Sequence, residues 1–299
     1  MGGRRDDDQV GRRVLVTGAG GKTGRAVIAA LRGRGATVRA FLRDEARAAE
    51  IAGVDRGGDP DVEVVVGDQR EVDDLAGALD DVDAVYAIAP NVSPHEVAMA
   101  RAMVIACRSA GVLRLVFHSV VHPQLTAMPH HADKARAEEL VIESGLAWTI
   151  LQPNVYLQNL AGYVDGLRAG RFEVPYATDR PAAMVDLRDV AEVAARCLLD
   201  DLGVHGVFEL SGPAEVTSVD IALAASEHRG GPVEVRRQDP DAWATATANA
   251  ELPDATRQRL RAMFAHYDRH GSPGDATVLR ALLGREPRDL HGYLDDLLT

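Results

Sequence analysis

The chain has 299 residues, of which 46% are hydrophobic and 26% are charged, so it is long enough for one large domain or for a domain with a smaller partner. Its net charge of -12 argues against a nucleic-acid partner, because affinity for a phosphate backbone comes mostly from lysine and arginine. The two cysteines, Cys107 and Cys197, fall in amphipathic helical patterns and cannot build a disulfide framework. We therefore expect buried free thiols and a reducing compartment.

The first residues, "MGGRRDDDQVGRR", are polar and lack the apolar core of a signal peptide. We expect residues 1–11 to form a flexible tail. No apolar run approaches the roughly 18 residues that a membrane span requires. These features predict a soluble cytoplasmic protein without a membrane partner.

Short Val-rich runs alternate with helical stretches over residues 12–153. The runs are "RRVLVTG", "ATVRAFLRD", "DVEVVVGD", "VDAVYAIAP", "VLRLVFHS" and "LAWTILQP". Apolar runs without strict alternation are typical of strands that are covered on both faces. The pattern predicts an α/β fold with a doubly wound parallel sheet.

After Pro153 the regular alternation of short apolar runs and helical stretches ends. The segment "VDLRDVAEVAARCLLDD" predicts a helix started by Asp186, and the short strand "GVFELSG" and a helix from Ser218 follow. A longer helix is expected around "ATRQRLRAMFAHYDRHG". Residues 154–299 are therefore expected to form a smaller, mostly helical, interleaved cap region that binds the substrate and returns some strands to the sheet.

A glycine-rich loop follows the first predicted strand. Gly18, Gly21 and Gly24 lie between "VLVTG" and the helix "KTGRAVIAAL", which is the context of the Rossmann dinucleotide-binding turn. In that turn one glycine allows the sharp bend, one admits the pyrophosphate and one lets helix and strand pack. The triphosphate-binding P-loop is excluded, because it needs a glycine where Val16 stands.

Two further residues of this turn are candidate cofactor ligands, Lys22 and Thr23. Of the 33 lysine and arginine residues of the chain, all but Lys22 and Lys134 are arginines. Lys22 either touches a phosphate or ribose, or is a solvated lysine of the first helical turn. The pattern leaves both interpretations open.

The residues at the end of the second predicted strand indicate whether the coenzyme is NAD(H) or NADP(H). An NAD site places an acidic side chain there for the ribose 2′-hydroxyl, but here Arg43 precedes Asp44. A guanidinium matches a 2′-phosphate, so the sequence favours NADP(H) over NAD(H). After the third strand, Asp68 and Gln69 either reach the adenine or form a simple turn. The remaining candidate cofactor contacts follow the fourth and sixth strands: Ala89, Pro90, Pro153 and Asn154.

With these residues in place, the sequence resembles the NmrA-like branch of the atypical short-chain dehydrogenase/reductases. The resemblance covers nearly the whole chain through "VTGAGGKTGR", "FLRD", "GDQ", "LVFHSV", "LQPNVYLQNL", "VDLRDVAEVAA" and "FELSGP". Typical members of the wider superfamily carry Ser, then Tyr-x-x-x-Lys. Ser119 and Lys134 stand at two of these places, but the tyrosine position is His130.

The resemblance implies that Ser119 and Lys134 are cofactor ligands and that Lys134, His130 and Ser119 form the catalytic group. His130 and Lys134 are i and i+4 on one predicted helix, hence on one face. An imidazole can donate a proton near neutral pH. His130 is therefore a proton donor, a hydrogen-bonding residue or an inert replacement, and the sequence leaves all three open.

Four histidines crowd into this segment, but their spacing matches no zinc motif, so we expect no metal. His122 and Tyr156 are candidate substrate contacts, with ordinary packing as the alternative. The same alternative applies to three weaker candidates: Tyr163, His266 and Tyr267.

The function that these patterns favour is an NADPH-dependent reductase, a monomer or homodimer, that transfers hydride to a small conjugated acceptor such as a quinone, enone, imine or ketone. Two other functions remain open. One is an NADP(H)-binding redox sensor or regulator without turnover, and the other is a non-redox biosynthetic isomerase or cyclase.

Overall fold

The computed structural model describes residues 11–51, 62–200, 202–246 and 252–299. The predicted N-terminal tail lies outside these residues except for Gly11. The chain divides into two compact units. The first comprises Met1–Pro123, Asp133–Gln152 and Val190–Phe208, and the second comprises Gln124–Ala132, Pro153–Asp189 and Glu209–Thr299.

The main sheet has the strand order β3-β2-β1-β4-β5-β6-β8 among the described residues. The strands are β1 (Arg13–Val16), β2 (Thr37–Leu42), β3 (Val62–Val66), β4 (Ala84–Ala87), β5 (Arg114–His118), β6 (Trp148–Pro153) and β8 (Gly206–Leu210). Strands β1 to β6 pair in parallel, and Val14 lies opposite Val38 on one side and Ala84 on the other. The predicted doubly wound parallel sheet is confirmed.

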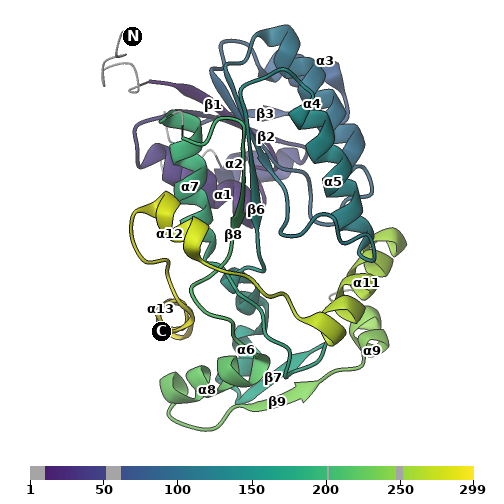
Figure 1. Cartoon of the computed structure of the whole chain (residues 1–299), viewed down its shortest axis with the longest axis vertical. Coiled ribbons are helices and arrows are strands. Elements are labelled where there is room, and N and C mark those ends of the chain that lie inside the picture. The colour runs from purple at the N-terminus through teal and green to yellow at the C-terminus, as the bar shows by residue number, and fades with distance from the viewer. Residues whose placement is uncertain (1–10, 52–61, 201, 247–251) are drawn as a thin grey trace. The chain divides into compact units, whose positions relative to one another are not determined.

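Helices cover both faces of this sheet, as Figure 1 shows. Helices α3 (Val72–Ala78), α4 (Glu96–Ala110) and α5 (Pro129–Ile142) lie on one face, and α1 (Lys22–Arg32) and α7 (Leu187–Leu199) lie on the other. The segment after β2 holds a short 3₁₀ turn, η2 (Glu45–Arg47), and α2 (Ala48–Ile51).

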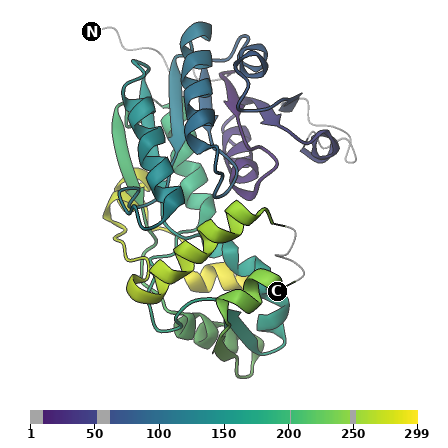
Figure 2. The same cartoon turned by 90° about the vertical axis from the view of Figure 1, so that its right-hand side faces the viewer.

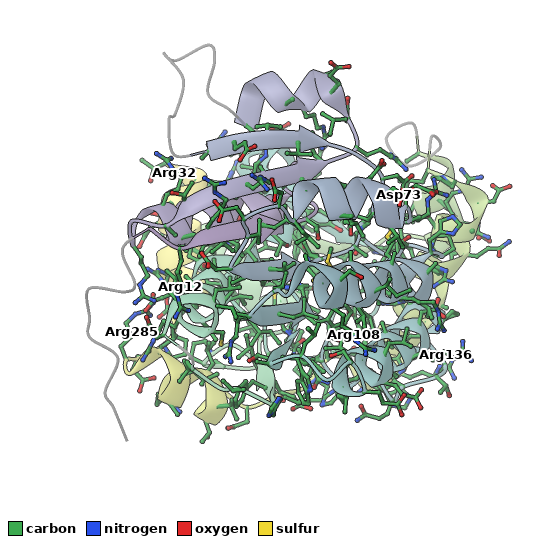
Figure 3. All side chains as sticks on the ribbon, turned by 90° about the horizontal axis from the view of Figure 1, so that it is seen from above. Arg12, Arg32, Asp73, Arg108, Arg136 and Arg285 are labelled. Carbon is green, nitrogen blue, oxygen red and sulfur yellow. The ribbon has the colours of Figure 1, made fainter. Side chains whose placement is uncertain are left out.

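The sheet and the first group of helices share a core. Side chains of the strands, such as Leu15 and Phe117, pack with Leu75 of α3, Met103 of α4 and Val141 of α5. Burial of this apolar surface is the main force that holds the layers together. The opposite, solvent side of these helices carries charged residues, and Figure 3 shows three of them: Asp73, Arg108 and Arg136.

The second unit contains a small parallel sheet that the sequence did not predict, β7 (Arg171–Val174) beside β9 (Glu234–Arg237). Its helical segments are η4 (Leu157–Tyr163), α6 (Val164–Arg168), α8 (Ser218–Arg229), α9 (Pro240–Thr245), α11 (Asp254–His270), α12 (Thr277–Leu283) and α13 (Leu290–Leu298). Helix α13 carries the C-terminus and packs with α8 through Leu294 and Ile221 (Figure 2). The predicted start of α8 at Ser218 is confirmed, and a reciprocal capping box of Thr217 and Asp220 explains it.

Both cysteines are buried free thiols, as expected, and burial raises the pKa of each to about 12. In the described part of the chain, no helix is long and apolar enough to cross a membrane.

Candidate functional site

The ends of strands β1 to β5 gather most of the predicted cofactor residues of the first unit. Parallel strands place their carboxyl ends at one edge of the sheet, and Gly18, Arg43, Asp68, Ala89 and Ser119 each follow such an end. The strand order reverses between β1 and β4. In open α/β sheets, ligands bind outside the carboxyl ends at this kind of reversal.

The glycine loop at this edge allows the backbone of α1 to lie close to the backbone of the loop. Gly18 has φ +57, a conformation that glycine adopts without strain, and its carbonyl accepts from the Gly21 amide at 2.9 Å. A Cβ on Gly24 would lie 2.5 Å from the Gly18 oxygen. Only glycine therefore permits α1 to start this close to the loop.

The N-terminus of α1 fits a bound diphosphate. Its N-cap, Gly21, offers no side-chain hydrogen bond, and its first turn holds no acidic residue. Helix N-terminal amides and the helix dipole favour anions. Thr23 is buried in this turn, and the side chain of Lys22 is exposed.

A reciprocal pair of hydrogen bonds joins the ends of β1 and β4. The Thr17 hydroxyl donates to the Ile88 carbonyl at 2.9 Å and accepts from the Ile88 amide at 2.8 Å. The pair fixes the glycine loop beside the segment that carries Ala89, which is half-buried, and Pro90, which is exposed. These two candidates thus border the reversal of strand order.

At the end of β2, the arginine and the acidic residue have different surroundings. Arg43 is exposed. Asp44 instead caps η2 by accepting from the Ala46 amide at 3.0 Å, and it forms an ion pair with Arg47 at 3.7 Å. The carboxylate that would hold a ribose 2′-hydroxyl is therefore engaged by its own chain.

Asp68 is also engaged locally, by a residue that the sequence analysis did not single out. Hydrogen bonds from the side chain and backbone of Arg70 lower the pKa of Asp68 to about 2, and the closest contact between the two side chains is 2.6 Å. The neighbouring Gln69 is half-buried.

Lys134 and Ser119 belong to a buried polar network in the first unit. Lys134 Nζ donates to Glu96 Oε1 at 2.7 Å and to the His118 carbonyl at 2.6 Å. The Ser119 hydroxyl donates to Glu138 Oε1. Gln152 Nε2 donates to the two oxygens of Glu138 at 2.8 and 3.0 Å.

Three members of this network were not predicted from the sequence: Glu96, Glu138 and Gln152. Glu138 is four residues after Lys134 on α5, so the i, i+4 rule applied to that helix would have found it. Burial raises the pKa of Glu138, while the bonds from Ser119 and Gln152 and the charge of Lys134 oppose the rise. No comparable pattern marks Glu96, which lies 38 residues from Lys134 along the chain.

His118 lies fully buried on β5, and its Nδ1 contacts the Tyr86 hydroxyl. Burial, with a smaller contribution from the charge of Lys134, lowers the pKa of His118 well below 6.5. The imidazole is therefore neutral at physiological pH, and it adds no positive charge beside the lysine.

The other histidines of the segment are separated between the units. His122 belongs to the first unit, is half-buried and has φ +52, which is uncommon for a residue with a side chain. His130 and His131 belong to the second unit, and their rings meet edge to face with centroids 4.5 Å apart. Across the described ranges, no group of three His, Cys, Asp or Glu side chains is arranged to hold a metal ion.

Asn154, in the second unit, has a fully engaged side chain. Its Nδ2 donates to Ser211 Oγ and the Ser272 carbonyl, both at 3.2 Å, and to the Pro273 carbonyl at 3.3 Å. Its Oδ1 accepts from Ser272 Oγ and the Val155 amide, both at 2.7 Å. The side chain is 3% exposed, so this amide ties three segments of the second unit together.

The remaining candidates of the second unit lie in packed surroundings. Pro153 is buried, and Tyr156 is half-buried at the start of η4. The three weaker candidates make ring contacts: Tyr163 with Phe172, Tyr267 with Tyr176, and His266 with His270.

Comparison with known proteins identifies the family to which this chain belongs. The model of the NmrA-like family matches residues 11–294. The chain belongs to the NmrA-like family. An NAD(P)H azoreductase of Xenophilus azovorans is 29% identical over 84% of this chain and 86% of its own length.

Two solved structures show the same fold. An NADPH-dependent quinone oxidoreductase of Escherichia coli complexed with NADPH has a TM-score of 0.80 at 23% identity, covering 96% of this NmrA-like chain and 100% of its own. NmrA, a negative transcriptional regulator in complex with NAD, has a TM-score of 0.77 at 17% identity, covering 96% and 95%. At 23% and 17% sequence identity, the two structures show similarity of fold only.

Proposed function

We propose that this NmrA-like protein is an NADPH-dependent reductase that transfers hydride to a small conjugated acceptor such as a quinone, enone, imine or ketone. The observation that carries the proposal is the glycine loop at the reversal of strand order, followed by a helix N-terminus without a side-chain cap. Such a helix N-terminus favours a diphosphate. The names of the relatives support an NAD(P)H-dependent oxidoreductase.

The preference for NADP(H) rests on the end of β2. Arg43 is exposed there and can pair with a 2′-phosphate, whereas Asp44 already caps η2 and contacts Arg47. Lys134 would bind a ribose hydroxyl of the coenzyme. When bound, NADPH supplies the hydride.

The proton of the reduction needs a donor in the absence of the usual tyrosine. The hydrogen of Ser119 is directed to Glu138, so Ser119 can offer an acceptor lone pair but is not positioned as the donor in this arrangement. We assign the donor role to His130, with His122 and Tyr156 as substrate contacts and residues 154–299 as the region that binds the substrate.

The test is a calorimetric titration with NADPH and NADH, followed by NADPH oxidation across a panel of quinones, enones, imines and ketones. We expect tighter binding of NADPH and turnover of at least one acceptor class. Binding of neither coenzyme would refute the proposal.

Two observations favour a second function, an NADP(H)-binding sensor or regulator without turnover. His130 replaces the catalytic tyrosine, and a regulator that binds NAD shares the fold. A sensor without turnover would bind NADPH tightly, reduce no acceptor of the panel and bind oxidised and reduced coenzyme with comparable affinity. Robust steady-state turnover would eliminate this function.

A further inference from the structure

The ammonium group of Lys134 is held by its own chain. Nζ lies 2.7 Å from Glu96 Oε1, 2.6 Å from the His118 carbonyl and 5.0 Å from the centroid of the Phe117 ring. The side chains of Lys134 and Glu96 are only 13% and 5% exposed. Water therefore screens this ion pair poorly, and its electrostatic effect exceeds that of a surface pair.

An ammonium group has three N–H donors. Glu96 and the His118 carbonyl accept two of them. Within the described part of the chain the third donor has no acceptor, so it is left for a ligand hydroxyl. Because the first two bonds fix the rotation of the amino group, they also fix the direction of the third.

The position of Glu96 suits an anion. It is the first residue of α4, where the helix dipole favours a carboxylate. The loop before α4 is also fixed, since the His95 amide donates to Ser93 Oγ at 3.1 Å and the Ser93 amide donates to the Pro90 carbonyl at 3.2 Å. Glu96 therefore connects the segment that follows β4 with the lysine on α5.

We propose that Glu96 is the positioning residue of Lys134: its carboxylate holds the ammonium group in a fixed orientation, so that the remaining N–H can bind the coenzyme ribose. The proposal rests on the proposed function for the coenzyme. The ion pair itself can be tested without it, because the chain contains only two lysines.

The test uses protein labelled with lysine carrying carbon-13 at Cε. Such protein gives two lysine signals, and the Lys22→Arg variant assigns them. The chemical shift of the Lys134 Cε signal is compared between wild type, Glu96→Gln and a control, Glu139→Gln, which changes an exposed glutamate of α5.

Three titratable groups face the lysine: Glu96 of α4, His118 of β5 and Glu138 of α5. His118 is neutral, and Glu138 is retained in both variants. Removing the carboxylate that contacts Nζ should shift the Lys134 Cε signal, and Glu139→Gln should leave that signal unchanged.

The Kd for NADPH, measured by calorimetry, completes the test. We expect Glu96→Gln to weaken NADPH binding about tenfold or more, and Glu96→Asp to restore part of the affinity. In a Lys134→Met background, Glu96→Gln should cause no further loss, because the two residues act as one unit.

The outcomes separate the two proposals. If NADPH binds to wild type but neither the lysine signal nor the Kd responds to Glu96→Gln, the role of Glu96 is refuted. If the lysine signal shifts while wild type binds no NADPH, the ion pair stands, and the coenzyme assignment and the positioning role that depends on it both fall.

Discussion

Replacement of Gly24 by alanine tests the geometry of the glycine loop. The added Cβ would lie 2.5 Å from the Gly18 oxygen, 2.7 Å from Ala19 Cα and 2.9 Å from the Gly18 carbonyl carbon. All three atoms are backbone, so only movement of the loop or of α1 relieves the overlap. Overpacking of this kind costs about 1–3 kcal/mol, against a gain of about 0.5–1 kcal/mol for alanine over glycine in a helix.

A matched control exists in α3. A Cβ on Gly77 would have no heavy atom within 4 Å, so Gly77→Ala should gain the helix preference without an overlap. We expect Gly24→Ala to destabilise the protein by about 1–2 kcal/mol and Gly77→Ala to stabilise it by about 0.5–1 kcal/mol.

Thermal unfolding followed by circular dichroism measures both effects. At roughly 2–4 °C per kcal/mol, the two melting temperatures should move in opposite directions by several degrees. If Gly24→Ala is as stable as Gly77→Ala, the close approach between α1 and the glycine loop does not exist. The loop backbone is then not shaped to bind a diphosphate.

Four other substitutions have defined outcomes. Arg43→Ala should weaken NADPH binding far more than NADH binding in calorimetry, and equal losses would show that Arg43 does not read the 2′-phosphate. His130→Phe should lower kcat by about 100-fold and flatten its pH profile, and an unchanged profile would remove His130 as the proton donor. Asn154→Ala should lower stability by about 1–3 kcal/mol in denaturant unfolding, because buried donors and acceptors lose their partner. The raised pKa of Glu138 means that the folded chain holds this proton more tightly than the unfolded chain, so stability falls as pH rises from 4.5 through the folded pKa. Glu138→Gln should flatten that fall in pH-dependent unfolding, and a slope equal to wild type would contradict the assignment.

The parallel sheet and the glycine loop could be predicted because their signals are local. Apolar runs of five or six residues separated by helical stretches specify buried parallel strands, and a glycine turn between strand and helix specifies its own backbone. The small sheet of β7 and β9 escaped prediction because its strands are short and carry few apolar residues: β7 has two, and β9 has only Val235 and exposes its other three residues. Such short strands form only when a distant partner is available.

The contacts of the candidate site residues, in contrast, could not be predicted from local sequence. The family resemblance pointed to Ser119 and Lys134, and helical spacing could have added Glu138. Neither could show that Glu138 accepts from Ser119 or that Glu96 pairs with Lys134, because hydrogen bonds between distant segments leave no periodicity. Asn154 illustrates the same limit. Its position after the sixth strand indicated a coenzyme contact, whereas in the structure its amide bonds to residues more than 50 positions away.

By itself, the sequence determined the order of the strands and helices of the main sheet, the glycine loop and the two places where a lysine interrupts an arginine-rich chain. Tertiary structure alone decided which carboxylates lie against which cations and hydroxyls. The reason is physical: backbone conformation depends on neighbouring residues along the chain, whereas the charge and orientation of a buried side chain depend on groups that only folding brings within 3 Å.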